Sequence, residues 1–136
     1  MIAYLDSSVL LRIALNQKNK AKEFSQITLG VSSQILKVEC LRTLDRLHVM
    51  GHINEDKLLA LSDFIYESLA RIELIPVTDP ILEQASEPRG LKLGTLDAIH
   101  LATALALGDE LDAFVTYDDR LADAARALGL PVVRPA

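Results

Sequence analysis

Short apolar runs alternate with helical patterns along the whole chain, and this alternation is the strongest constraint on its fold. Strands that alternate with helices predict an α/β fold, in which helices cover both faces of a parallel sheet. The expected strands are residues 2–5, 30–32, 72–77, 113–116 and 131–133. The expected helices are residues 8–15, 20–27, 34–49, 55–70, a short one opening at Asp79, 96–107 and 120–128. In open sheets of this kind, functional sites form beyond the carboxyl ends of the strands.

Small residues mark the ends of several expected helices. Ser33, Asn54 and Thr95 stand where a side chain can cap the first turn of a helix. Gly51, Gly108 and Gly129 follow the last helical positions, where glycine commonly ends a helix. These residues predict where the helices begin and end.

Composition limits the class of protein. The chain has 136 residues, of which 50% are hydrophobic and 24% are charged, so we expect one globular domain over residues 1–136. The net charge of −5 argues against a protein that coats nucleic acid by bulk electrostatics. This charge is compatible with an enzyme whose bound metal ions contact the phosphates of a nucleic acid.

The single cysteine, Cys40, cannot form an intramolecular disulfide, and its apolar neighbours favour a buried thiol. The N-terminus lacks the pattern of a signal peptide. Spanning a bilayer takes roughly 20 apolar residues, and no uncharged run approaches that length. We therefore expect a cytoplasmic protein that does not associate with a membrane.

Asp97 is the one carboxylate in an otherwise almost wholly apolar helical segment, residues 96–107. A helix that is apolar on every side is normally buried, and a buried carboxylate is costly unless it is paired, hydrogen-bonded or bound to a metal. The helix dipole favours a negative charge there by only about 0.3–1 kcal/mol, against several kcal/mol for burying an unpaired carboxylate. Unless it is partly exposed, Asp97 therefore needs a partner.

Three further acidic residues have both a plain and a functional interpretation. Asp6 and Asp118 follow expected strands and can cap the next helices, while Glu39 lies on a helix and can be solvated. Asp119, adjacent to Asp118, can equally be the cap. Asp6, Glu39 and Asp118 can converge with Asp97 at one edge of the sheet. Oxygen ligands without a cysteine cluster suit Mg²⁺ or Mn²⁺, which activate water for attack on phosphodiesters. The set predicts phosphoryl chemistry on a nucleic acid or nucleotide, and at least one raised carboxyl pKa in the metal-free protein.

Four segments of the chain resemble PIN-domain ribonucleases, specifically the VapC-type toxins of toxin–antitoxin pairs. They are residues 4–10, 38–42, 96–104 and 115–121. Their order and spacing across nearly the whole chain are more specific than any one segment. The resemblance implies a three-layer PIN fold with five parallel strands in the order 3-2-1-4-5. It also implies Mg²⁺- or Mn²⁺-dependent endonucleolytic cleavage of RNA.

The resemblance also implies roles for individual residues. Asp6 and Asp97 would be the principal metal ligands, and Glu39 and Asp118 would complete the acidic pocket, partly through water. Ser8 and Thr116 would be polar neighbours of the metal. The family pattern places the fourth carboxylate two residues after the threonine, which selects Asp118 over Asp119.

Basic residues near the expected strand ends could line an RNA path, although surface solvation is the default for each; they are Arg12, Arg42, Arg89, Lys92 and Arg120. His100 lies one turn after Asp97 and could be a ligand or a base, but a packing histidine is favoured. The family further implies a VapB-like antitoxin partner and a homodimer or a toxin–antitoxin hetero-oligomer.

Other functions compete with the ribonuclease. Asp6 could be the nucleophile of a phosphatase or phosphoacceptor domain, although Ser8 stands where a haloacid-dehalogenase-like phosphatase would carry a second aspartate. The chain could also be a PIN-fold nuclease outside a toxin pair or a non-catalytic binding module. The complete set of acids favours the metal-dependent nuclease over a binding module.

Overall fold

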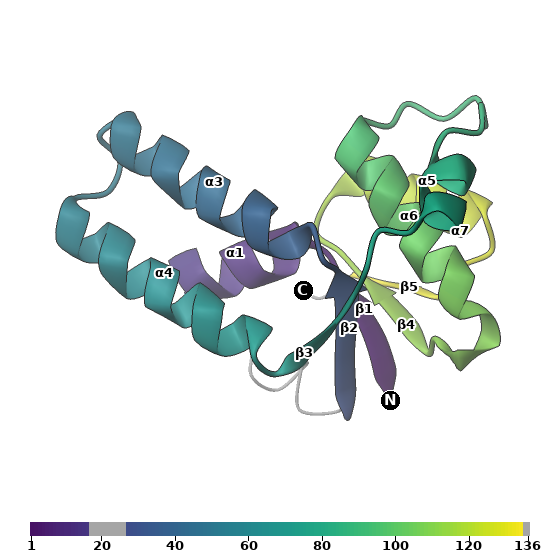
Figure 1. Ribbon diagram of the computed structural model, residues 1–136, viewed down its shortest axis with the longest axis horizontal. Coiled ribbons are helices and arrows are strands. Elements are labelled where there is room, and N and C mark those ends of the chain that lie inside the picture. Colours follow the sequence, from purple (N-terminus) through teal and green to yellow (C-terminus); the bar gives the residue numbers. More distant parts are fainter. Residues whose placement is uncertain (17–26, 135–136) are drawn as a thin grey trace.

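The computed structural model describes residues 1–16 and 27–134. Its strands form one parallel sheet in the order β3-β2-β1-β4-β5 (Figure 1), as predicted. The strands are β1 (Ile2–Leu5), β2 (Leu29–Ser33), β3 (Ile72–Ile75), β4 (Ala113–Val115) and β5 (Val132–Val133). The helix expected at residues 20–27 lies, except for Ile27, outside the described residues.

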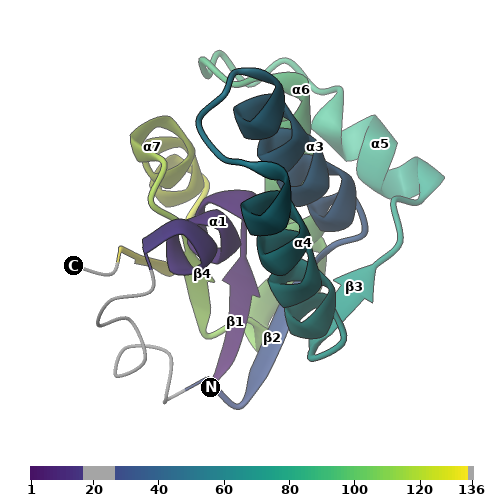
Figure 2. The same cartoon turned by 90° about the vertical axis from the view of Figure 1, so that its left-hand side faces the viewer.

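Helices cover both faces of this sheet. They are α1 (Ser7–Asn16), α3 (Leu36–Val49), α4 (Glu55–Leu69), α5 (Asp79–Ala85), α6 (Thr95–Leu107) and α7 (Asp119–Ala127), with a 3₁₀ turn η1 (Gly108–Glu110). Figures 1 and 2 show α3 and α4 side by side as an arm that extends away from α5, α6 and α7. The result is the predicted three-layer arrangement, with the arm and α1 on one face and α6 and α7 on the other.

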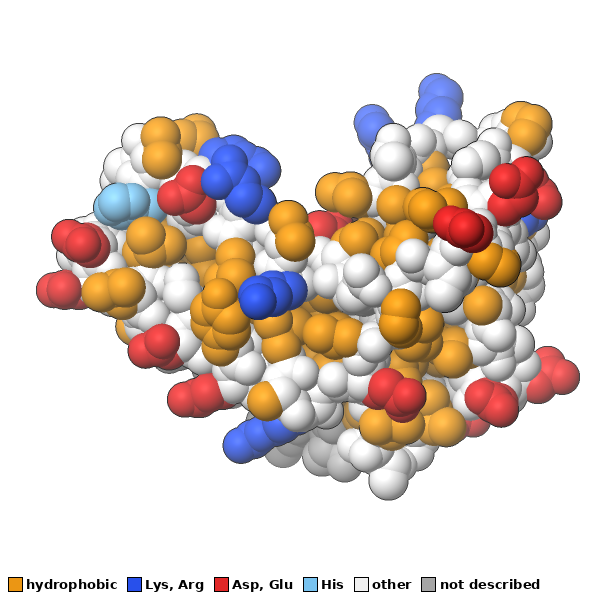
Figure 3. Space-filling view, in the orientation of Figure 1, with side chains coloured by type: hydrophobic (Ala, Val, Ile, Leu, Met, Phe, Trp, Pro, Cys, Tyr) orange, Lys and Arg blue, Asp and Glu red, His pale blue; other side chains and the backbone are white. Residues whose placement is uncertain are grey.

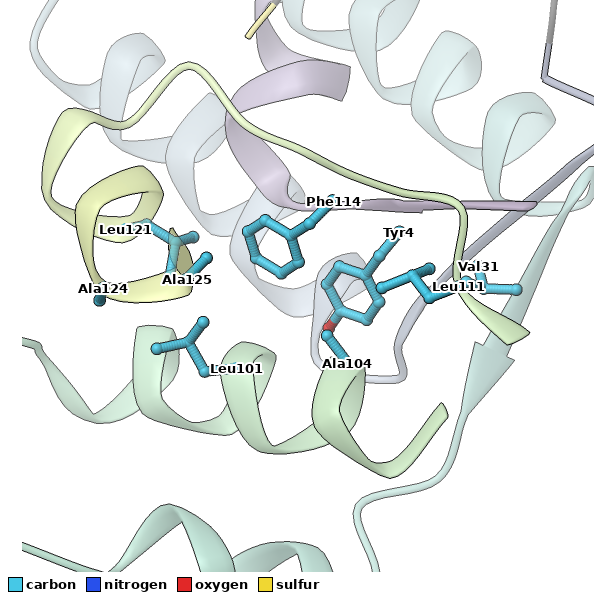
Figure 4. Close-up of a cluster of buried hydrophobic side chains, with 9 residues drawn as sticks. All are labelled: Tyr4, Val31, Leu101, Ala104, Leu111, Phe114, Leu121, Ala124 and Ala125. Carbon is cyan, nitrogen blue, oxygen red and sulfur yellow. The ribbon is translucent and has the colours of Figure 1, made fainter. Parts of the chain in front are cut away.

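One core cluster lies between the sheet and helices α6 and α7. Tyr4 of β1 stacks on Phe114 of β4, with ring centroids 5.2 Å apart and planes 2° apart (Figure 4). Leu101 of α6 and Leu121 of α7 close the cluster over these rings. Because side chains alternate along a strand, the neighbours Ala3 and Leu5 face the opposite layer.

A second cluster joins the arm to α1. Its buried members are Leu10, Ala14, Leu36, Cys40, Leu44, Leu61, Ile65 and Leu69. Cys40 is fully buried there, as predicted, and burial raises the pKa of its thiol to about 12. The thiol therefore packs as a small hydrophobic group.

The helix ends confirm some of the predicted caps and correct others. The Asn54 side chain accepts the Lys57 N–H at 2.8 Å, as predicted. Thr95 is not a cap: Gly94 precedes the helix in extended backbone, and Thr95 is already helical. Ser33 accepts the Ile35 N–H at 3.3 Å in the turn before α3, so it caps that turn and not the helix.

Two boundaries have clear local causes. Gly108 ends α6 at φ +57°, a backbone conformation that side chains with a Cβ rarely adopt. Strand β3 ends at Ile75 and not at Val77, because the Val77 N–H donates to the Gln34 side chain at 2.9 Å.

Within the described part of the chain, no helix is long and apolar enough to cross a membrane.

Candidate active site

Asp6 lies at the carboxyl end of β1 and is 3% exposed. Its Oδ1 accepts the Ser8 hydroxyl at 2.5 Å, and its Oδ2 accepts the Thr116 hydroxyl at 2.9 Å. The predicted polar neighbours Ser8 and Thr116 thus hold both oxygens of the carboxylate. This arrangement disfavours Asp6 as the exposed nucleophile of a phosphatase.

The same two hydroxyls organise the segment that follows β4. Ser8 Oγ accepts the Tyr117 N–H at 2.9 Å, and Thr116 Oγ1 accepts the Asp118 N–H at 3.0 Å. The ends of β1 and β4 are therefore joined through side chains as well as through the sheet. Asp118 is brought to the same edge of the sheet as Asp6.

Asp118 has a second role as the N-cap of α7. Its Oδ1 accepts the Leu121 N–H at 3.1 Å. Asp119, the alternative cap, instead begins the helix and forms an ion pair with Arg134. The adjacent acids therefore have separate partners, and the cap interpretation applies to Asp118.

Glu39 lies in the first turn of α3 and reaches across to α6. Its Oε1 is 2.5 Å from Nε2 of His100, which is 1% exposed. The interpretation of Glu39 as a solvated surface charge is wrong, because its side chain is only 12% exposed. His100 is a satisfied core histidine, in agreement with the favoured interpretation.

Asp97 lies in the first turn of α6 and is half-buried. The expectation that this helix is buried on every side is wrong at its start, where Leu96 is 48% exposed. Residues 99–104 are buried, because they pack against the sheet and α5. Among the described residues, no side chain or N–H donates a hydrogen bond to the Asp97 carboxylate.

Two of the four carboxyls have raised pKa values, as predicted. Burial raises the pKa of Asp6, opposed by the hydrogen bonds from Ser8 and Thr116. Burial also raises the pKa of Asp97, and the negative charge of Asp118 raises it further. Desolvation is the larger cause at both positions and carboxylate repulsion the smaller one.

The four acids surround one edge of the sheet without forming a closed metal cage. No group of three His, Cys, Asp or Glu side chains in the described part of the chain could by itself hold a metal ion. Mg²⁺ commonly keeps several waters and takes only one or two protein carboxylates. The oxygen-only donor set and the raised pKa values of Asp6 and Asp97 therefore fit a hydrated divalent cation.

A hollow of about 420 Å³ lies beside the acids, between α3 and the start of α6. Its lining is Ser7, Ile35, Val38, Glu39, Arg42, Thr43, Arg46 and Leu96. Figure 3 shows basic side chains over α3 and over the loop before α6, with acidic side chains between them. Arg46 is not among the residues predicted from sequence, although its spacing from Glu39 and Arg42 places all three on one helix face.

The predicted RNA contacts occupy separate places around this edge. The Arg12 guanidinium lies 4.3 Å from the centre of the Tyr117 ring, next to the segment after β4. Arg89 pairs with Glu87 at 3.3 Å, and Lys92 is exposed, both in the loop that leads into α6. The structure therefore places Arg12 beside the segment that leads into Asp118, and the two loop residues just before the helix that carries Asp97.

Comparisons with known proteins agree with this fold. The model of the PIN domain family matches residues 3–127. Ribonuclease VapC46 of Mycobacterium tuberculosis is 34% identical over 135 residues, covering 97% of this chain and 96% of that protein. The chain therefore belongs to the PIN-domain family. Within that family it belongs with the VapC-type ribonucleases.

Solved structures extend the likeness in fold. VapBC2 from Rickettsia felis, bound to a DNA fragment from its promoter, matches with a TM-score of 0.70 and 17% identity, covering all of both chains. VapC20 of Mycobacterium tuberculosis, a sarcin–ricin loop cleaving toxin, matches with a TM-score of 0.68 and 18% identity, covering 99% of this chain and 100% of that one. At these identities the likeness concerns the fold.

In the metal-free protein, Asp97 should lower the free energy of unfolding to an extent that depends on pH. A raised folded-state pKa means that the folded state holds this proton more tightly than the unfolded state. The contribution of Asp97 to stability is therefore lost as pH rises from the ordinary value of 3.8 through the raised value. Urea unfolding in EDTA should show Asp97→Asn gaining stability relative to wild type over this range. A difference in unfolding free energy between the variant and wild type that is constant with pH would contradict the raised pKa of Asp97.

Proposed function

We propose that this chain is a metal-dependent endoribonuclease and the toxin component of a VapBC-type pair. The observation that carries the proposal is the buried Asp6 carboxylate, held by Ser8 and Thr116 at the edge where Asp97, Asp118 and Glu39 gather. Membership of the PIN-domain family and the likeness to a named ribonuclease support RNA as the substrate.

The proposed metal is Mg²⁺ or Mn²⁺, with Asp6 and Asp97 as its principal ligands and Glu39 and Asp118 acting partly through water. When bound, the ion supplies an activated water and neutralises charge on the phosphodiester during in-line attack. Ser8 and Thr116 keep the Asp6 carboxylate in one orientation, because each donates to a different oxygen. Asp118 is limited in movement by its cap on α7.

The hollow beside α3 is the proposed path of the RNA strand. Arg42 and Arg46 would contact phosphates on one side of the acids, and Arg12, Arg89 and Lys92 would do so on the others. Exposed Val38 and Leu96 offer apolar surface for bases.

Arg46→Ala should raise KM for RNA more than it lowers kcat, because it removes a phosphate contact in the proposed path. An unchanged KM would remove Arg46 from the path.

The test is cleavage of RNA by the purified free chain, with and without divalent ions. Cleavage should require Mg²⁺ or Mn²⁺, stop in EDTA and return when the ion is added in excess. Sequencing of RNA ends after induction of wild type and of Asp97→Asn should reveal the cut sites in the wild type only. Cleavage that continues at full rate in EDTA would exclude the metal-dependent mechanism.

A VapB-like antitoxin is the proposed partner, and the complex would be cytoplasmic. Solved neighbours that are toxin–antitoxin complexes support this assignment. A basic antitoxin segment would complement the acidic edge of the sheet, either on a homodimer of this chain or in a hetero-oligomer. The free chain should therefore cleave RNA faster than the purified complex, and equal rates would contradict inhibition by the partner.

A further inference from the structure

A buried chain of hydrogen bonds connects the core of the sheet to Glu39. The Tyr4 hydroxyl lies 2.6 Å from His100 Nδ1, and His100 Nε2 lies 2.5 Å from Glu39 Oε1. Tyr4 is 0% exposed and His100 is 1% exposed. Strand β1, helix α6 and helix α3 are thereby joined by three side chains.

The chemistry of the two end groups assigns the donors. An ionised carboxylate can only accept, so His100 Nε2–H donates to Glu39. In a neutral imidazole Nδ1 is then the acceptor, and the Tyr4 hydroxyl donates to it. Burial raises the pKa of Tyr4, so this phenol keeps the hydrogen that the arrangement requires.

Tyr4 is held in one position at the start of this chain of hydrogen bonds. Its ring stacks on Phe114 and meets the His100 ring edge-on, with centroids 5.7 Å apart and planes 80° apart (Figure 4 shows Tyr4 and Phe114). The imidazole is therefore held by packing and by a hydrogen bond at Nδ1. Its Nε2–H is aimed at one oxygen of Glu39.

Glu39 needs such support because it belongs to the arm. Helix α3 packs chiefly on α4 and α1, through Leu36, Cys40 and Leu44. The His100 bond joins the acid of this helix to α6, the helix that carries Asp97. It therefore sets the position of Glu39 relative to Asp97 across the hollow.

We propose that His100 is a positioning residue, which holds the Glu39 carboxylate toward the shared cation site through a hydrogen-bond chain that starts at Tyr4. The proposal rests on the proposed function, because that function makes Glu39 part of the metal site. Groups that orient metal-binding carboxylates commonly change metal affinity by about 10- to 100-fold when they are removed. A histidine that only packs would affect folding without this loss.

Two substitutions at one position separate positioning from packing. In His100→Gln the amide nitrogen can stand where Nε2 stands and still donate to Glu39. In His100→Asn the shorter side chain can reach the Tyr4 hydroxyl but not Glu39. His52→Asn, at an exposed histidine, is the matched control.

The main measurement is Mn²⁺ affinity of the full chain by calorimetry, with thermal unfolding measured in EDTA for each variant. His100→Asn should bind Mn²⁺ at least about tenfold more weakly than wild type, whereas His100→Gln and His52→Asn should stay close to it. Mn²⁺ affinity that is unchanged in a folded His100→Asn variant would overturn the proposal.

A second measurement covers the case in which His100→Asn fails to fold. Nitrogen-15 spectra of the wild-type imidazole should show hydrogen on Nε2 of His100, and Glu39→Gln should shift that resonance. Hydrogen on Nδ1 alone would overturn the assignment.

The two proposals can fail separately. If Mn²⁺ binding follows the expected pattern but wild type does not cleave RNA, the ribonuclease proposal fails and the positioning role stands. If wild type cleaves RNA with a metal and His100→Asn binds and cleaves equally well, the positioning role fails and the ribonuclease stands.

Discussion

Asp97→Asn should lower the rate of RNA cleavage by about a hundredfold to a thousandfold, the usual cost of removing one preorganised charge-stabilising group. Burial is the main cause of the raised pKa of the half-buried Asp97 carboxylate, and the repulsion from Asp118, which raises it further, reflects an excess of negative charge between these two acids. A divalent cation relieves that excess, and an amide attracts the cation far less than a carboxylate does. The measurement is cleavage of a labelled RNA at saturating Mn²⁺, with Asp6→Asn expected to behave alike.

The matched control is Asp63→Asn, which makes the same change at an exposed position on α4. It should retain wild-type cleavage, because a solvated surface carboxylate contributes little. Near-normal cleavage by Asp97→Asn would remove this residue from the reaction. Loss of cleavage in both variants would instead indicate a general effect of charge on RNA binding.

Leu44→Ala should lower the free energy of unfolding by about 2–5 kcal/mol. Leu44 is fully buried where α3 packs on α1 and α4, so the truncated side chain leaves a cavity in the cluster that holds the arm. That loss is large against a typical total stability of about 5–15 kcal/mol. Urea unfolding monitored by circular dichroism measures it.

Val49→Ala on the same helix is the control, because Val49 is 76% exposed. It should change the free energy of unfolding by no more than about 0.5 kcal/mol. Equal losses in the two variants would mean that the arm cluster is not a main source of stability. Because α3 also carries Glu39 and Arg46, Leu44→Ala should weaken RNA cleavage as well.

Strand and helix positions could be predicted because hydrophobic periodicity and capping residues act over a few neighbours. Asn54 and Gly108 mark helix ends through local backbone chemistry, and both predictions are confirmed. Thr95 shows the limit: a threonine one residue after a glycine is an equally plausible cap, and only the backbone shows that Gly94 precedes the first helical residue. The exposure of Leu96 likewise depends on what packs over the start of α6.

The candidate site residues could be named from the strand ends and from the resemblance to PIN-domain ribonucleases, but their hydrogen-bond partners could not. Asp6 and Asp118 follow apolar strands, so their meeting at one edge of a parallel sheet is expected from the chain alone. The pairing of Glu39 with His100 joins residues 61 positions apart on two helices, and a surface charge is an equally good interpretation of Glu39 in the sequence. Arg46 joins the candidate RNA path through the position of its helix beside the hollow.

The sequence by itself determined the parallel sheet and its covering helices through local hydrophobic patterns, and it indicated the four candidate acids through segments that resemble PIN-domain ribonucleases. The tertiary structure alone decided how those acids are held. Thr116 donates to Asp6 across 110 residues, and His100 donates to Glu39 from the opposite layer. Such bonds form only where packing brings distant side chains within about 3 Å, a distance that no local pattern in the sequence specifies.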